Sequence, residues 1–279
     1  MVLRRVALVT GASRGIGRAT AIALAQNGFN LVVTARSLTN ESSVFEGTIR
    51  NDPEAGAVLA GGLAETVAAI EAVGARCEAV EMDLTDRGSV RMAGDAALAA
   101  FKRVDVFVNN AIYQGPGIND PVQTSTAATV DKVISADATT PLLLIQAVLP
   151  GMLKRSDGVI IHLTSGAATL APRAPFGQGG WGIAYAMAKG AAHRMVGVLH
   201  AEFAEQGVRA YNLNPGHVVT EVGRARAARA GTQATGQSPE IPAAAALWLA
   251  LGSPQARSLA GSDVVARDLV AQYDLIHAE

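Results

Sequence analysis

The sequence has little of several features that mark other protein classes. It contains one cysteine, Cys77, among 279 residues, so no internal disulfide can form. Its 23 basic residues are balanced by 24 acidic ones, which leaves no positive excess to bind a nucleic-acid backbone. No group of histidines, cysteines and carboxylates has the spacing of metal ligands. These shortages argue against a disulfide-rich secreted protein, a nucleic-acid-binding protein and a metal site.

Long apolar runs are also missing. The stretch 141–152 is interrupted by Gln146 and Pro150, and it is shorter than the roughly 20 residues that a membrane span needs. Near the amino terminus, Arg4 and Arg5 lead directly into a short apolar run, without the layout of a signal peptide. We therefore expect a cytoplasmic protein with no membrane partner.

What is present is an alternation of short β-type runs and longer helical patterns. Hydrophobic residues form 49% of the chain, enough for a substantial core. The expected strands are 6–10, 31–34, 77–82, 104–109, 159–163 and 208–213. The expected helices are 16–27, 62–73, 89–101, 141–155 and 184–206. This alternation predicts an α/β fold, a doubly wound parallel sheet of Rossmann type, in one domain that covers residues 1–279.

Three long loops interrupt this rhythm, at 37–61, 167–182 and 221–239. Loops of this length are uncommon in a compact domain unless they have a function or are disordered. In an open α/β sheet, the loops that follow the carboxyl ends of the strands border the ligand crevice. We therefore expect the second and third loops to shape a substrate pocket.

A glycine-rich segment, 10–17 (TGASRGIG), follows the first expected strand. Gly11, Gly15 and Gly17 would permit a tight turn and let a pyrophosphate approach the backbone at the positive end of the next helix. Their spacing differs from the general G-x-G-x-x-G fingerprint, and a glycine-rich turn can also be a purely structural connection. The position at the first strand-to-helix turn favours a dinucleotide site.

The end of the second expected strand bears on which dinucleotide binds. An acidic side chain there would bind the ribose hydroxyls of NAD, but this position holds Ala35, followed by Arg36. Arg14 lies in the glycine loop, and two guanidinium groups near one ribose can pair with a 2′-phosphate. NADP is therefore favoured over NAD, unless both arginines are solvated surface charges. Asp83, after the third strand, either accepts a hydrogen bond from the adenine amino group or caps a helix.

Tyr185 and Lys189 are four residues apart, hence on one face of an expected helix. A lysine cation near a tyrosine hydroxyl favours the phenolate, lowers the pKa of the tyrosine and lets it exchange a proton with an alcohol near neutral pH. This pair alone is weak evidence, because any helix can carry it. It gains weight from the ordered set formed by the glycine loop, 109–111 (NNA), Ser165, Tyr185 and Lys189.

With these motifs in this order, the chain resembles the short-chain dehydrogenase/reductase family from residue 4 to about residue 266. The resemblance implies an NADP-dependent oxidoreductase that interconverts a carbonyl and an alcohol by hydride transfer. In that family the serine binds the substrate oxygen, the tyrosine exchanges the proton, and the lysine holds the nicotinamide ribose. These roles fall on Ser165, Tyr185 and Lys189. The segment 214–220 (NPGHVVT) resembles the one that meets the cofactor, through Val218 and Thr220 here.

The expected site has two overlapping groups of residues. The expected catalytic residues are Ser165, Tyr185, Lys189 and Asp137. The expected cofactor-binding residues are Gly11, Ser13, Arg14, Gly15, Ile16, Gly17, Arg36, Asp83, Leu84, Asn109, Ala111, Tyr185, Lys189, Val218 and Thr220. By the same resemblance Asn109 ties its strand to the neighbouring strands and borders the adenosine. Helices 141–155 and 184–206 either form the contact of a homodimer or homotetramer, as in the family, or are buried inside one subunit.

Asp137 departs from the family pattern, which usually has an asparagine whose backbone positions a proton-relaying water. A carboxylate can accept the same hydrogen bonds, but it would add a negative charge facing Lys189. The alternative is that the side chain turns toward solvent. We expect Asp137 to substitute for the relay asparagine.

Two further departures concern the pocket. Ile112 stands where the family commonly has glycine, so the crevice has less room. The segment between Ser165 and Tyr185 is longer than usual, and its Phe176 and Trp181 either stack on an apolar substrate or pack the loop down. A 3-oxoacyl thioester reductase is one candidate, while the long loops favour another small-molecule ketone or alcohol. The alternative from a different class is a cofactor-binding regulatory protein with little or no turnover.

Overall fold

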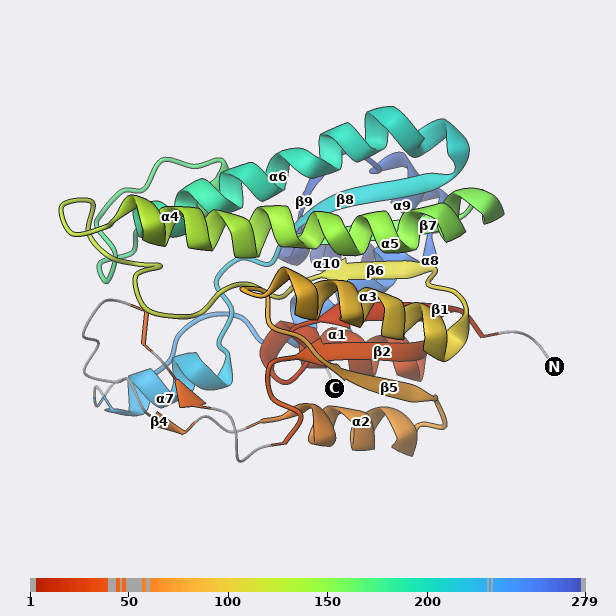
Figure 1. Cartoon of the computed structure of the whole chain (residues 1–279), viewed down its shortest axis with the longest axis horizontal. Coiled ribbons are helices and arrows are strands. Elements are labelled where there is room, and N and C mark those ends of the chain that lie inside the picture. Colours follow the sequence, from red (N-terminus) through yellow and green to blue (C-terminus); the bar gives the residue numbers. More distant parts are fainter. Residues whose placement is uncertain are drawn as a thin grey trace.

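A seven-stranded parallel sheet forms the centre of the molecule (Figure 1). The computed structural model describes residues 4–39, 44–45, 47–48, 57–58, 61–229, 231 and 233–276. The sheet order is β5-β2-β1-β6-β7-β8-β9. These strands are β1 (Val6–Thr10), β2 (Asn30–Ala35), β5 (Cys77–Glu81), β6 (Val106–Asn109), β7 (Gly158–Leu163), β8 (Val208–Asn214) and β9 (Asp263–Val265). The predicted doubly wound α/β fold is confirmed.

Helices cover both faces of the sheet, and each face has its own hydrophobic core. The helices on one face are α1 (Gly15–Gln26), α2 (Leu63–Ala72), α8 (Glu240–Leu251), α9 (Pro254–Ser258) and α10 (Ala266–Tyr273). Those on the other face are α3 (Arg87–Phe101), α4 (Ala127–Ile134), α5 (Thr140–Arg155) and α6 (Ile183–Phe203). Strand β1 shows why the strands are uniformly apolar, since Ala7 and Val9 join the first core while Val6 and Leu8 join the second.

The three predicted long loops differ in how well the structure agrees with the prediction. The predicted loop 221–239 begins as a helix, α7 (Glu221–Arg229). The predicted loop 167–182 has no helix or strand after η3 (Gly166–Ala168). The loop 37–61 lies partly outside the described residues, and its described part includes the antiparallel pair β3 (Val44–Phe45) and β4 (Ala57–Val58).

One continuous helical stretch, Ala127–Arg155, combines α4, the π-helical turn η2 (Ser135–Thr139) and α5. By length and composition alone it could cross a membrane. Half of its most apolar window is buried inside the fold, and a core helix passes the same test, so this is weak evidence for a membrane span.

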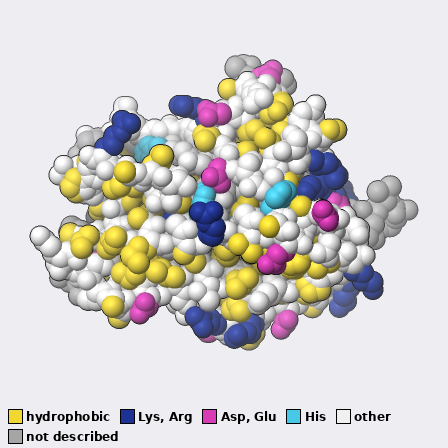
Figure 2. All heavy atoms as spheres, turned by 90° about the horizontal axis from the view of Figure 1, so that it is seen from above, with side chains coloured by type: hydrophobic (Ala, Val, Ile, Leu, Met, Phe, Trp, Pro, Cys, Tyr) yellow, Lys and Arg dark blue, Asp and Glu magenta, His cyan; other side chains and the backbone are white. Residues whose placement is uncertain are grey.

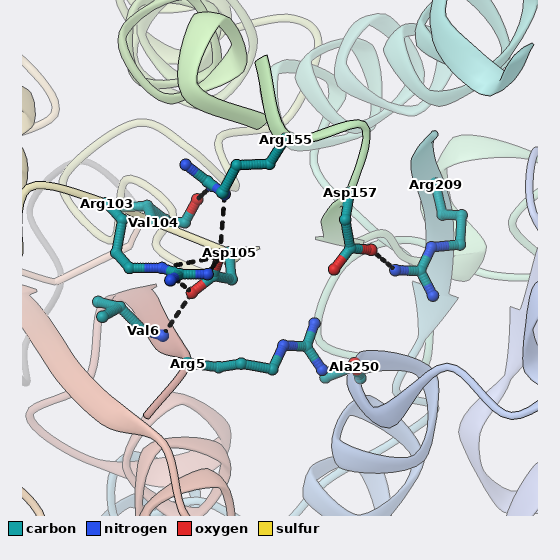
Figure 3. Close-up of polar contacts among 9 residues, drawn as sticks. All are labelled: Arg5, Val6, Arg103, Val104, Asp105, Arg155, Asp157, Arg209 and Ala250. Atoms are coloured by element: carbon teal, nitrogen blue, oxygen red, sulfur yellow. Dashed lines mark hydrogen bonds and ion pairs between the residues drawn. The ribbon is translucent and has the colours of Figure 1, made fainter. Parts of the chain in front are cut away.

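A buried carboxylate joins several elements at the amino-terminal ends of the strands (Figure 3). Asp105, just before β6, accepts a hydrogen bond from the Val6 backbone N–H at 2.8 Å. The same carboxylate pairs with Arg103 at 2.6 Å and with Arg155, at the end of α5, at 3.3 Å. Asp105 therefore ties β1, β6 and α5 together at this edge.

Candidate active site

The glycine loop lies where the strand order of the sheet reverses, between β1 and β6, which is where open α/β sheets bind ligands. Gly11 and Gly15 have φ angles of +67° and +53°, in the left-handed region that favours glycine. A Cβ atom on Gly17 would lie 2.3 Å from the Gly11 carbonyl oxygen, so no larger residue fits there. The loop thus brings its backbone close to the amino terminus of α1, as a pyrophosphate site requires.

Asn110 holds this loop against β6. Its Nδ2 donates hydrogen bonds to the carbonyl oxygens of Thr10 at 2.9 Å and Gly11 at 3.2 Å. The backbone N–H groups of Asn110 and Ala111 both donate to Thr10 Oγ1, at 3.1 and 3.0 Å. Asn110 is absent from the predicted site, although the doubled asparagine in the sequence was a usable signal.

Arg14 lies in the glycine loop and is the N-cap residue of α1. Its Nη2 donates to the Gly61 carbonyl oxygen at 2.7 Å. Burial lowers the pKa of Arg14, the Glu221 carboxylate opposes this shift, and the Arg36 cation adds to it. The two arginines that are predicted to bind a 2′-phosphate are therefore close enough for their positive charges to repel each other.

Asp83 and Leu84 lie in the turn after β5. Asp83 Oδ1 accepts hydrogen bonds from the backbone N–H and the hydroxyl of Thr85, at 2.8 and 2.9 Å. The cap of α3 is Asp86 instead, so the helix-cap alternative for Asp83 is wrong. The Leu84 carbonyl oxygen accepts a hydrogen bond from the Thr140 hydroxyl at 3.1 Å.

Thr220 approaches the glycine loop from the segment that follows β8. A Cβ atom on Gly15 would lie 3.1 Å from the Thr220 methyl group. Val218, two residues earlier, forms a bridge with Gln237. The fold thus brings the predicted cofactor segment onto the predicted pyrophosphate loop.

Ser165, Tyr185 and Lys189 meet where the carboxyl end of β7 faces the first turns of α6. Ser165 follows β7, and its hydroxyl caps η3 by accepting from the Ala167 N–H at 3.2 Å. The Ser165 side chain is also close enough to Tyr185 to lower the pKa of the tyrosine. Lys189, one helical turn after Tyr185, is 3% exposed and donates to the Leu163 carbonyl oxygen at 2.7 Å. Three of the four predicted catalytic residues are therefore held in one place.

The pKa of Tyr185 differs from the prediction. Burial raises it, the nearby Ser165 side chain lowers it, and the Asp137 carboxylate raises it. Burial is the largest of these effects, so the net shift is upward, although the sequence predicts a lowered pKa from Lys189. A phenol of this kind keeps its proton at neutral pH and can donate it.

Asp137 faces inward from the π-helical turn η2 and is 2% exposed, so the alternative that it turns toward solvent is wrong. Its Oδ1 accepts the Tyr113 backbone N–H at 2.6 Å, while its buried Oδ2 has no hydrogen-bond partner among the described residues. Burial raises the pKa of Asp137 to about 7, against the opposing effects of Lys189 and the Tyr113 hydrogen bond. Burial likewise lowers the pKa of Lys189 to about 8, opposed by Asp137.

A row of polar residues crosses the sheet beneath α6, and of its members only Asn109 is predicted as a site residue from the sequence. Asn109, His162, Asn212 and Asp263 are paired neighbours on β6, β7, β8 and β9. Asn109 Nδ2 lies 2.9 Å from His162 Nδ1, so Asn109 does join its strand to a neighbour. Burial, followed by Lys189 and His193, lowers the pKa of His162 well below its usual value, so this histidine is neutral.

The aromatic residues of the loop 167–182 are placed differently. A Cβ atom on Gly166 would lie 3.5 Å from the Trp181 ring, so Trp181 packs against the start of the loop. Phe176 is 39% exposed and remains accessible. Among the described residues, no group of three or more histidines, cysteines and carboxylates could hold a metal ion.

Comparison with known proteins identifies close resemblance over most of the chain. The family model for the short chain dehydrogenases matches residues 5–60 and 55–230. The chain is 29% identical over 268 residues to 3beta-hydroxysteroid dehydrogenase 1 of Eggerthella lenta, across 92% of this chain and 90% of that protein. It is 33% identical over 221 residues to a 3-oxoacyl-[acyl-carrier-protein] reductase of Synechocystis sp., across 78% of this chain and 76% of that protein.

Solved structures of short-chain dehydrogenases and reductases are also similar to this chain. A metagenomic short-chain oxidoreductase in complex with NADP has a TM-score of 0.67 at 26% identity, covering 94% of this chain and 95% of that one. A short-chain type dehydrogenase/reductase from Mycobacterium marinum has a TM-score of 0.73 over 94% of this chain and 93% of that one. Its 22% identity makes it a likeness of fold alone.

Proposed function

Because the chain belongs to the short-chain dehydrogenase family, we propose that it is an NADP-dependent oxidoreductase that interconverts a carbonyl and an alcohol in a small molecule. The observation that carries the proposal is the meeting of Ser165, Tyr185 and Lys189 beside the glycine loop. A cytoplasmic location and a homodimer or homotetramer belong to the same proposal.

The residues around the glycine loop fit a dinucleotide. Gly17 leaves a space that any Cβ atom would fill, and the amino terminus of α1 opens onto this loop. Anionic oxygens are stabilised at such a terminus by backbone N–H groups and the helix dipole. Arg14 and Arg36 support NADP over NAD, because a 2′-phosphate would relieve the repulsion between their charges.

A bound nicotinamide cofactor supplies or accepts the hydride. In the reduction direction, Tyr185 donates its phenolic proton to the oxygen that gains negative charge, and its raised pKa keeps that proton available. The Ser165 hydroxyl donates a hydrogen bond to the same oxygen. Lys189 is anchored to the Leu163 carbonyl, which fixes its ammonium group one helical turn from Tyr185. Asp137, buried beside Lys189, balances that charge and offers Oδ2 as an acceptor.

The proposal is tested by titrating the purified protein with NADPH and NADH and then screening ketones, aldehydes and alcohols. We expect tighter binding of NADPH, and turnover that falls at least a hundredfold in Tyr185→Phe, the size of effect typical for loss of a general acid. Tyr185→Phe should still bind NADPH, which separates chemistry from folding.

Three outcomes would count against the assignment. Tighter binding of NADH than NADPH would remove the role of Arg14 and Arg36. Full turnover by Tyr185→Phe would remove the role of Tyr185 as the proton donor. NADPH binding without turnover on any substrate would favour the regulatory alternative.

A further inference from the structure

A carboxylate from a distant part of the chain is bound to the amino terminus of α1. Glu221, the first residue of α7, accepts a hydrogen bond from the Gly15 backbone N–H, with 3.0 Å between the nitrogen and Oε2. Helix α1 has no acidic residue in its first turn, and its N-cap residue Arg14 makes no side-chain capping hydrogen bond. Glu221 therefore supplies the anionic cap that the local sequence of α1 lacks.

The same carboxylate also acts on Arg14. Among the charges around Arg14, Glu221 raises the pKa of the guanidinium group against the lowering effect of burial. Glu221 thus lies between two groups that bind phosphate in proteins, a backbone N–H at a helix amino terminus and an arginine. Its neighbour Thr220 touches Gly15 as well, so the approach of α7 to this loop rests on more than one side chain.

A carboxylate and a phosphate compete for such a place. Both are stabilised by the same N–H group and by the same positive end of the helix dipole, and the two negative charges repel each other at short range. We propose that Glu221 is an intramolecular competitor of the cofactor pyrophosphate, so that binding of the dinucleotide displaces Glu221 from Gly15 and releases α7 from the glycine loop. This inference rests on the proposed function, since it needs a dinucleotide at that loop.

The displacement couples two parts of the site. Helix α7 opens the segment 221–239, which follows β8 and whose residue Gln237 pairs with Val218. Since the dinucleotide binds only when Glu221 leaves, the hydrogen bond that holds Glu221 at Gly15 weakens cofactor binding, and the coupling is reciprocal. The segment expected to shape the substrate pocket therefore responds to the cofactor before the substrate arrives.

The test is a binding measurement on the full chain, by isothermal titration or nucleotide fluorescence, with NADPH and with NADH. We expect Glu221→Ala to bind both dinucleotides about three- to thirtyfold more tightly than the wild type, from the usual strength of a charge at a helix amino terminus. The affinity of Glu221→Gln should lie between those of the wild type and Glu221→Ala, because its amide oxygen can still accept a hydrogen bond from the Gly15 N–H. A similar gain for both dinucleotides points to the pyrophosphate, which they share, rather than to the 2′-phosphate.

Glu240→Gln is the matched control, because it removes one negative charge from the exposed first turn of α8 and should leave both affinities unchanged. Unchanged or weaker binding by Glu221→Ala, in a protein whose wild type binds NADPH, would overturn this inference alone. If the wild type and all variants bind neither dinucleotide, the proposed function fails, and this inference fails with it.

Discussion

At the scale of single residues, Asp137 and Lys189 are a buried pair that titrates near neutral pH. The pKa of Asp137 is about 7 in the fold against 3.8 for an ordinary aspartate, so the unfolded chain releases this proton first as pH rises. The folded state then holds more protons than the unfolded state between about pH 4 and 7, and its free energy of unfolding falls across this range. In Asp137→Asn we expect this fall to be smaller by a few kcal/mol at most, at about 1.4 kcal/mol per pKa unit.

Urea unfolding at pH 5 and pH 7.5 measures the effect, and exposed Asp268→Asn should behave as the wild type does. In turnover assays, Asp137→Asn should match or exceed the wild type, because an asparagine Oδ1 can still accept the Tyr113 N–H. Equal pH slopes of stability in wild type and variant would show that the carboxylate is not buried as described. A large loss of turnover with intact NADPH binding would contradict its proposed place in the relay.

Residue types and spacings predicted those features of the site that depend on neighbours within one helix or loop. Two residues four positions apart in a helix lie on the same face whatever the fold, so the proximity of Tyr185 and Lys189 could be predicted from their spacing. The direction of the Tyr185 pKa shift was not readable, because burial by the rest of the molecule outweighs a neighbouring charge. The contact between Glu221 and Gly15 was also out of reach, since it joins segments 206 residues apart.

At the scale of secondary-structure elements, the amino-terminal edge of the sheet depends on Asp105 (Figure 3). This buried carboxylate receives the Val6 N–H and pairs with Arg103 and Arg155, so its loss leaves three donors without their acceptor. We expect Asp105→Ala to lower the free energy of unfolding by about 3–5 kcal/mol, as for one partner removed from a buried ion pair. Urea unfolding provides the measurement.

Asp268→Ala gives the contrast, because both partners of its ion pair with Arg267 are largely exposed. It should lower the free energy of unfolding by less than about 1 kcal/mol. Similar losses from the two substitutions would mean that Asp105 does not hold the edge of the sheet.

Elements with a clear pattern were predicted to within a few residues, and those without one were not. β1 and α1 have the apolar composition and glycine boundaries that the sequence makes plain. The helix α8 is apolar on every side, so it has no periodic face to detect, and β9 is only three residues long. α7 has arginines and alanines without an apolar stripe, which is why it was predicted as loop.

At the scale of the whole molecule, one face of α6 has side chains that suit contact with a second copy (Figure 2). Met187, Ala191, Arg194 and Val198 recur at helical spacing and are all exposed, with Met187 at 46% and Val198 at 49%. Figure 2 looks onto the α6 side of the molecule, where apolar side chains lie among charged ones. Obligate interfaces bury apolar side chains such as Met187 and Val198, so this face of α6 suits the predicted homodimer or homotetramer.

Val198→Glu tests that assembly, because a carboxylate in the centre of an apolar contact loses its hydration without gaining a partner. We expect light scattering after gel filtration to give at least twice the chain mass for the wild type and a smaller assembly for Val198→Glu. Val122→Glu is the control, since Val122 is equally apolar and is exposed in the loop before α4 rather than on α6. A monomeric wild type would contradict the oligomer outright. An unchanged mass for Val198→Glu would instead move the contact away from α6, since the two subunits must then meet through another face.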